Sequence, residues 1–204
     1  MVDNFEIIKE FITTQNLLKE KEDFLFFQVI QRKKDFEPGQ VRLGRNNNNR
    51  LIKPYYIYSL EQLDSYKEEI IKLCQLFNAR AGINLNKRNS KDVAIKCLEI
   101  LAIAMRKNDE FTGVSKIYSS ACGKESSGDG YWLVDLDRED LPNIENIKKA
   151  IFDVEPTSVN KIICEIPTKS GIHLITKRFN RQKFSEFYPT ISIHTNNPVN
   201  LFIP

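Results

Sequence analysis

The sequence predicts an α/β (α+β) protein in which an N-terminal mixed α/β lobe is fused to a C-terminal βαββαβ lobe. Its length, 204 residues, suits one compact domain or two small lobes that share a core. Short apolar runs typical of strands alternate along it with segments of helical periodicity. A Ser/Gly-rich segment at 119–130 (SSACGKESSGDG) separates two sets of elements, which divides the chain into lobes 1–118 and 119–204.

Composition and charge exclude several classes of protein. Apolar residues make up 41% of the chain, enough to fill a core and too many for global disorder. The 30 Lys+Arg and 27 Asp+Glu give a net charge of +3, which excludes a histone-like polycation. Four widely spaced cysteines and two histidines disfavour a zinc site. The absence of a long apolar run or a signal-like N-terminus favours a cytoplasmic location with no membrane contact.

Each element of the first lobe has its own sequence signal. Apolar residues recur at helical spacing after Asp3 and Glu6, which stand at capping-box spacing. The run FLFFQVI is typical of a buried strand, and Ser59 with Gln62 forms a second capping box. Ser90 caps a third helix. The expected elements are helix 4–19, strand 24–30, strand 51–58, helix 59–77, strand 79–88 and helix 90–104.

Two segments of this lobe carry arginines that could contact phosphates. Strand 79–88 alternates apolar residues with a polar set that includes Arg80 and Arg88, a pattern typical of a half-buried strand with a polar face. The Gly/Asn-rich segment 36–50 carries Arg42 and Arg45, and ends at Arg50. These side chains form either a solvated surface or contacts with nucleic-acid phosphates.

The order of elements predicted for the second lobe matches a known arrangement. The patterns predict strand 131–137, helix 143–152, strands 161–166 and 171–177, helix 181–187 and strand 200–203. This βαββαβ order is the split βαβ arrangement of ferredoxin-like and RNA-recognition-motif folds. In that topology the first and third strands are neighbours at the centre of the sheet.

The strand YWLVDLD places two carboxylates on one face. Alternation puts Asp135 and Asp137 with Leu133 on one side of the strand. Two carboxylates so placed repel each other unless a cation lies between them, and Mg²⁺ prefers oxygen ligands of this kind. The alternative is that the strand ends at Asp135 and both aspartates lie in a solvated turn.

A histidine is expected on the neighbouring strand. In the segment PTKSGIHL, His173 shares a strand face with Gly171 and Lys177. The predicted topology brings His173 beside Asp135 and Asp137, within reach of one bound nucleotide. A structural, hydrogen-bonding histidine is the alternative.

These two motifs resemble those of archaeo-eukaryotic primases and primase-polymerases, in which a strand ending in D-h-D is followed by a strand with S-x-H or S-G-x-H. The resemblance implies an N-terminal α/β lobe joined to an RNA-recognition-motif-like lobe. It also implies that Asp135 and Asp137 bind catalytic Mg²⁺ or Mn²⁺, and that Ser170 and His173, with Gly171 and Lys177 beside them, bind the incoming nucleoside triphosphate.

The chain departs from this family at its third motif, an acidic residue on a later strand of the same lobe. The corresponding position here is Ser192, with His194 nearby. A missing carboxylate removes a metal ligand, which weakens the case for catalysis more than that for binding. Glu165, on the preceding strand, is a candidate substitute.

Further surface residues extend the predicted site. Arg80, Arg88, Lys169 and Arg178 are expected to contact the phosphates of a template or primer. Tyr55, Tyr56 and Tyr58 either stack on bases or pack within a sheet.

Three functional interpretations follow. The leading one is metal-dependent nucleotidyl transfer on nucleic acid, with other replication proteins as possible partners. The second is a non-catalytic nucleic-acid-binding or replication-assembly module on the same fold. The third is a ferredoxin-like protein that carries D-x-D by chance, in which His173 would be buried or far from Asp135.

Overall fold

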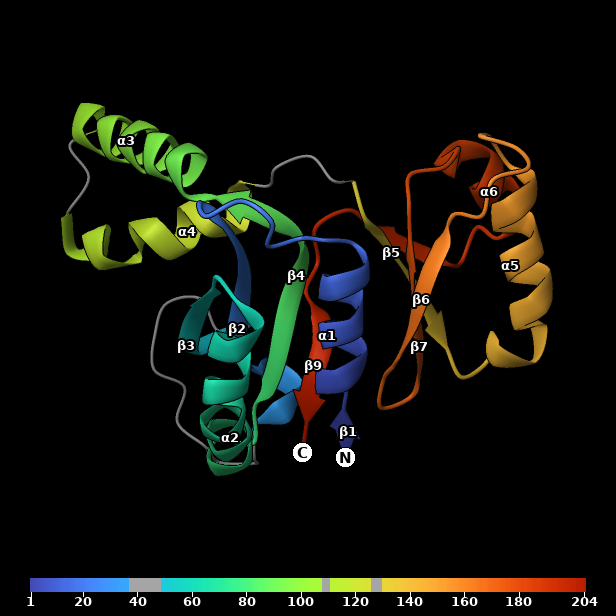
Figure 1. Ribbon diagram of the computed structural model, residues 1–204, viewed down its shortest axis with the longest axis horizontal. Coiled ribbons are helices and arrows are strands. Elements are labelled where there is room, and N and C mark those ends of the chain that lie inside the picture. The colour runs from blue at the N-terminus through green and yellow to red at the C-terminus, as the bar shows by residue number, and fades with distance from the viewer. Residues whose placement is uncertain (37–48, 108–110, 126–129) are drawn as a thin grey trace.

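The computed structural model describes residues 1–36, 49–107, 111–125 and 130–204, and within these ranges the chain is an α+β protein with two antiparallel sheets and six α-helices (Figure 1). The strands are β1 (Val2–Asp3), β2 (Asp23–Arg32), β3 (Asn49–Ile57), β4 (Arg80–Asn89), β5 (Trp132–Asp137), β6 (Ile162–Pro167), β7 (Gly171–Thr176), β8 (Ser192–His194) and β9 (Val199–Ile203). The helices are α1 (Phe5–Thr14), α2 (Leu60–Leu76), α3 (Ser90–Arg106), α4 (Ile117–Lys124), α5 (Ile144–Asp153) and α6 (Arg181–Phe187), with 3₁₀ turns at Lys33–Asp35, Phe111–Lys116 and Leu141–Asn143.

The strand order confirms one prediction of topology and corrects another. The smaller sheet has the order β6-β7-β5-β8, so the first and third strands of the second lobe are central neighbours as predicted. The larger sheet has the order β1-β9-β4-β2-β3. The predicted final strand 200–203 therefore forms, but it joins the first sheet instead of completing the second. The short strand β8 takes the fourth place.

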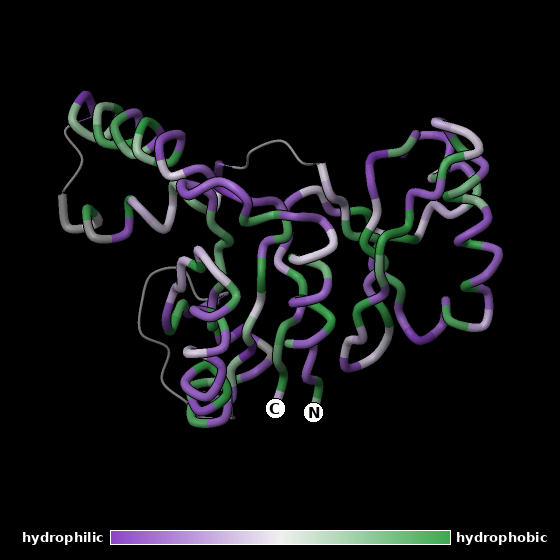
Figure 2. The backbone as a smooth tube through the Cα atoms, in the orientation of Figure 1, coloured by the Kyte–Doolittle hydropathy of each residue, from purple (hydrophilic) through white to green (hydrophobic). Residues whose placement is uncertain are grey.

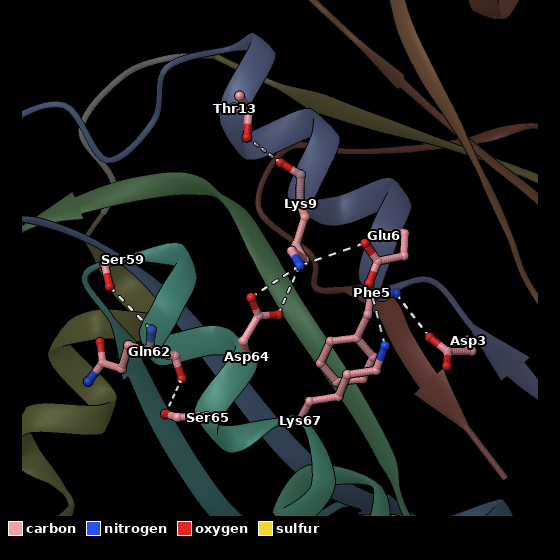
Figure 3. Close-up of polar contacts among 10 residues, drawn as sticks. All are labelled: Asp3, Phe5, Glu6, Lys9, Thr13, Ser59, Gln62, Asp64, Ser65 and Lys67. Carbon is pink, nitrogen blue, oxygen red and sulfur yellow. Dashed lines mark hydrogen bonds and ion pairs between the residues drawn. The ribbon is translucent and has the colours of Figure 1, made fainter.

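Helices cover both faces of the five-stranded sheet. Buried side chains of α1 and α2 pack with Leu25 and Phe27 of β2 on one face, and α3 and α4 pack with Phe24 and Phe26 on the other. Ion pairs also join α1 to α2 (Figure 3). The Nζ of Lys9 lies 2.9 Å from Asp64 Oδ1.

The four-stranded sheet is packed on both faces, which fixes its position against the first lobe. Leu133, Ile166 and Ile175 belong to the same buried cluster as the side chains of α1. On the opposite face, Val134 and Leu174 pack with α5 and α6. One face of the second sheet is therefore turned toward the first lobe (Figure 1).

The polar face of β4 is buried, which corrects the prediction of a half-buried, solvent-facing strand. Asn86 donates from Nδ2 to the carbonyls of Tyr131 and Thr195, at 3.1 and 3.0 Å, and its Oδ1 accepts from Tyr131 N–H at 2.9 Å. Asn84 donates to the carbonyl of Asn196 at 2.7 Å. The polar row of β4 (Asn84, Asn86 and Arg88) therefore binds the residue just before β5 and the residues just after β8, where the chain enters and leaves the four-stranded sheet.

Several element boundaries also differ from the sequence prediction. The helix predicted over 4–19 ends at Thr14, and Asn16 adopts a left-handed backbone with φ of 53°. Part of the predicted Ser/Gly loop 119–130 is helical, since α4 reaches Lys124. Arg42 and Arg45 lie outside the described residues.

Within the described ranges, no helix combines the length and apolarity needed to cross a membrane.

Replacing Asn86 by Ala is expected to lower the free energy of unfolding by at least ~2 kcal/mol, because buried backbone groups of Tyr131 and Thr195 would lose their partners. Urea denaturation with a constant m-value measures this loss. The control is Asn146→Ala, which removes an exposed asparagine whose bond is to Asn143. Equal midpoints for the two variants would contradict a structural role for the β4 row.

Candidate functional site

Asp135 and His173 form the centre of the candidate site. They are direct partners in the β5–β7 ladder, so their side chains lie on the same face of the sheet. His173 Nε2 lies 3.3 Å from Asp135 Oδ1. The predicted adjacency of the D-x-D and S-G-x-H strands is therefore confirmed.

The two partners differ in exposure. The carboxylate side chain of Asp135 is 42% exposed, while the imidazole of His173 is 10% exposed. His173 Nδ1 is buried and has no hydrogen-bond partner among the described residues. The third interpretation expected a histidine that is buried or far from Asp135; here the ring is buried and also contacts the carboxylate.

Asp137 lies at the end of the same strand and is exposed. It faces Gly171 across the ladder, and its Cα lies about 7 Å from that of Asp135. A Cβ on Gly171 would lie 1.9 Å from the carbonyl oxygen of Leu136. Glycine at this position therefore allows β7 to approach β5 beside the second aspartate.

A serine stands on the strand next to Asp135, on the side away from His173. Ser192 of β8 is the direct partner of Asp135 in the ladder, and it is the residue that the resemblance sets against the expected acidic position. Glu165 does not substitute: it is the partner of Leu174, on the other face of the sheet, and its Oε1 lies 2.7 Å from Lys148 Nζ of α5. Among the described residues, no group of three or more Asp, Glu, His or Cys side chains is arranged to hold a metal ion.

Neighbouring groups lower the pKa of Asp135. The hydrogen bond from His173 is the largest cause, and weaker electrostatic effects of His173, His194 and Arg32 add to it against the opposing effect of burial. Sequence reasoning did not indicate that Arg32, whose Nε lies 3.6 Å from Asp35 Oδ2, would influence Asp135. Arg32 ends β2 in the first lobe, and no sequence pattern indicates which strand end of one sheet faces the other sheet.

Two arginines predicted to contact nucleic acid have structural roles. Arg88 has no exposed surface, and it donates to the carbonyl of Cys122 and to Asn196 Oδ1 at 2.8 and 3.0 Å. The prediction for Arg88 is therefore wrong, because no phosphate can reach it. Arg80 is bound through two nitrogens to Asp35, with an Nη2–Oδ1 distance of 2.6 Å.

The remaining predicted binding residues fall into two groups. Lys169 and Ser170 are exposed in the β6–β7 turn, next to Gly171 and close to Asp137. Lys177 and Arg178 are exposed just beyond the other end of β7, about 13 and 17 Å from His173 at the rise of an extended chain. Lys169 and Ser170 therefore lie near Asp137, whereas Lys177 and Arg178 lie at the opposite end of β7.

The tyrosines of β3 mostly pack inside the first lobe. Tyr55 is 3% exposed, and the ring of Tyr56 stacks on Phe26 with centroids 5.6 Å apart. Tyr58 is 40% exposed, so of these three it offers the most open ring face to a base.

The residues present fit a magnesium-like cation. Mg²⁺ is commonly held by one or two protein carboxylates, while water and substrate phosphates supply its other oxygens. Asp135 and Asp137 provide such a pair on one sheet face, and Asp135 is held ionised. Ser192 and Glu165 add no charge to this pair.

Comparison of the chain with protein-family models, with curated proteins and with solved structures found no match.

Replacing His173 by Phe is expected to raise the pKa of Asp135, because the hydrogen bond that lowers it most is lost while burial remains. In the wild type, the lowered pKa extends the ionised range of Asp135 to more acidic pH. Its contribution to stability is present above the unfolded-state pKa of about 3.9 and is lost as pH falls through the folded value. Carboxyl-carbon NMR titration measures the shift. Glu165→Gln is the control, and an unchanged pKa in the His173 variant would contradict the assigned contact.

Proposed function

We propose that this protein is a primase-polymerase-like nucleotidyltransferase that binds a divalent cation and a nucleoside triphosphate at β5 and β7 and acts on a nucleic-acid strand. The observation that supports this best is the shared sheet face of Asp135, Asp137 and His173. The order β5-α5-β6-β7-α6-β8 also resembles the RNA-recognition-motif-like lobe of the archaeo-eukaryotic primases.

Each residue of the site has a proposed role. Asp135 and Asp137 would hold Mg²⁺ or Mn²⁺. The bound cation would supply charge neutralisation and polarise a phosphoryl oxygen. His173 positions Asp135 through Nε2 and keeps it anionic. Ser170 and Lys169, exposed in the adjoining turn, would contact the triphosphate with their hydroxyl and ammonium groups.

A phosphate contact by His173 itself places a condition on the ring. With Nε2 directed at Asp135, only Nδ1 is left for a phosphate oxygen, and both nitrogens donate only in the imidazolium form. Since Nδ1 is buried, the geometry favours the positioning role.

Arg32 of the first lobe contributes a smaller positive influence on Asp135; its Nε is paired with Asp35 at 3.6 Å and its side chain is 34% exposed. Lys169, exposed in the β6–β7 turn, is therefore the cation we propose for the triphosphate. Template or primer phosphates would follow Lys169 and Arg178 over the second lobe, and we place the protein in the cytoplasm with other replication proteins as candidate partners.

A second candidate function rests on Ser192. If nucleotidyl transfer requires a third carboxylate beside Asp135, its replacement by serine favours a non-catalytic nucleic-acid-binding or replication-assembly module. The same two carboxylates could still bind a cation and a nucleotide in such a module.

Addition of Mn²⁺ with a nucleoside triphosphate is expected to raise the midpoint of thermal unfolding by about 5 °C or more at 100 times the dissociation constant. The double variant Asp135→Asn/Asp137→Asn is expected to lose this shift. Glu165→Gln removes a carboxylate from the opposite face of the same sheet and is expected to retain it. A wild-type midpoint that does not move would refute nucleotide binding at this site.

Ser192→Asp is expected to tighten Mn²⁺ binding by about tenfold, because it adds a carboxylate directly beside Asp135. Isothermal titration measures the affinity, and primer extension measures activity. Thr157→Asp adds the same charge on an exposed loop and serves as the control. Extension by the wild type favours the enzyme. Extension only by Ser192→Asp favours the module, and no gain in metal affinity would contradict the placement of Ser192 at the metal position.

A further inference from the structure

The outer helix α3 carries an unpartnered apolar stripe. Its members recur at spacings of three, four and three residues and lie on the side of the helix away from α4; they are Ile95, Leu98, Ala102 and Met105. The exposed fractions of Ile95, Leu98 and Met105 are 49, 67 and 59%. This spacing is the a/d pattern with which one helix pairs with another.

The inner face of α3 is apolar as well. Val93 is fully buried against α4 and β2, and Cys97 and Ile100 pack beside it. A helix that is apolar on opposite faces is normally buried on both. Yet α3 lies at the outer edge of the first lobe, remote from the second sheet (Figure 1), and Figure 2 shows hydrophobic residues along its length. Its outer face therefore lacks a partner within the described residues.

We propose that this stripe binds the same stripe of a second copy of the chain, with the two α3 helices antiparallel. The distribution of charge along α3 supports a second copy of the chain as the binding partner. The flank of the stripe is acidic near its start, at Asp92, and basic at its end, at Arg106. A two-fold axis near the middle of α3 brings Asp92 of each chain toward Arg106 of the other, and it opposes the two helix dipoles favourably.

The centre of the flank is also compatible with this pairing. Glu99 of the two chains would approach each other near the axis, but each is neutralised within its own helix: Lys96 Nζ lies 2.7 Å from Glu99 Oε2. A parallel pair would instead place like-charged ends together. Antiparallel pairing is thus the arrangement that the sequence of α3 favours.

The expected dimer is weak. A helix of 17 residues is about 25 Å long, and one such helix pair buries less than the ~800 Å² per partner of a standard interface. We therefore expect monomer and dimer in a concentration-dependent equilibrium.

Sedimentation equilibrium on the full chain tests the proposal. Over a concentration range from about 5 to 500 μM, the average mass of the wild type is expected to rise from 23.7 kDa toward twice that value, a range suited to a weak interface. Leu98→Lys is expected to weaken the dimer at least about tenfold, because a charge would be buried in the seam. Leu76→Lys changes a residue that is 75% exposed on α2 and is expected to leave the dimer unchanged.

A charge exchange tests the orientation. Asp92→Lys and Arg106→Glu are each expected to weaken the dimer, and the double variant is expected to restore it, with circular dichroism confirming that helix content is kept. A wild type that stays monomeric overturns the proposal, as does a double variant that fails to recover. A monomer that binds anionic vesicles in a Leu98-dependent manner would overturn it in favour of a lipid surface.

Discussion

The position of the candidate site depends on the buried polar row of β4. Asn84, Asn86 and Arg88 hydrogen-bond to the segments at Tyr131 and at 195–196, through which the chain enters and leaves the four-stranded sheet. Because both connections are fixed at one row, the second sheet is held with one face toward the first lobe. That face carries Asp135 and His173 beside Leu133 and Ile175, which pack in the buried cluster of the first lobe. Burial lowers the pKa of Arg88 to about 10, so the row retains its positive charge at neutral pH.

The same row shows why the sequence could predict elements better than surfaces. Apolar periodicity predicted β4 within a residue at each end, and helix α6 over its full length. It could not show that Arg88 and the asparagines are covered, because the covering segments lie 34 or more residues away in the chain. A polar strand face has the same pattern whether it meets water or buried backbone groups. For the same reason β9 was predicted correctly as a strand and assigned to the wrong sheet.

The centre of the site was predictable because the antiparallel topology itself sets its geometry. Once β5 and β7 are neighbours, a strand ending in D-x-D and a hairpin with S-G-x-H bring Asp135 and His173 together. The remaining residues depend on exact register. Glu165 faces Lys148 because the β6–β7 turn sets a register in which it pairs with Leu174 and not with His173, and one residue of shift would exchange the faces of the strand.

The candidate site and the apolar stripe on α3 lie in different parts of the molecule, so a partner bound to the stripe would not cover the site. The aspartates lie on the second sheet, whereas α3 extends from the far side of the first lobe (Figure 1). Pairing through α3 would therefore leave both sites open and carry them at the two ends of the assembly. If the sites bind nucleic acid as proposed, a two-fold arrangement of this kind would let two sites engage one strand, which would raise the effective concentration of the second contact without changing either site. A weak interface on α3 would then gain strength whenever both sites were occupied by the same strand.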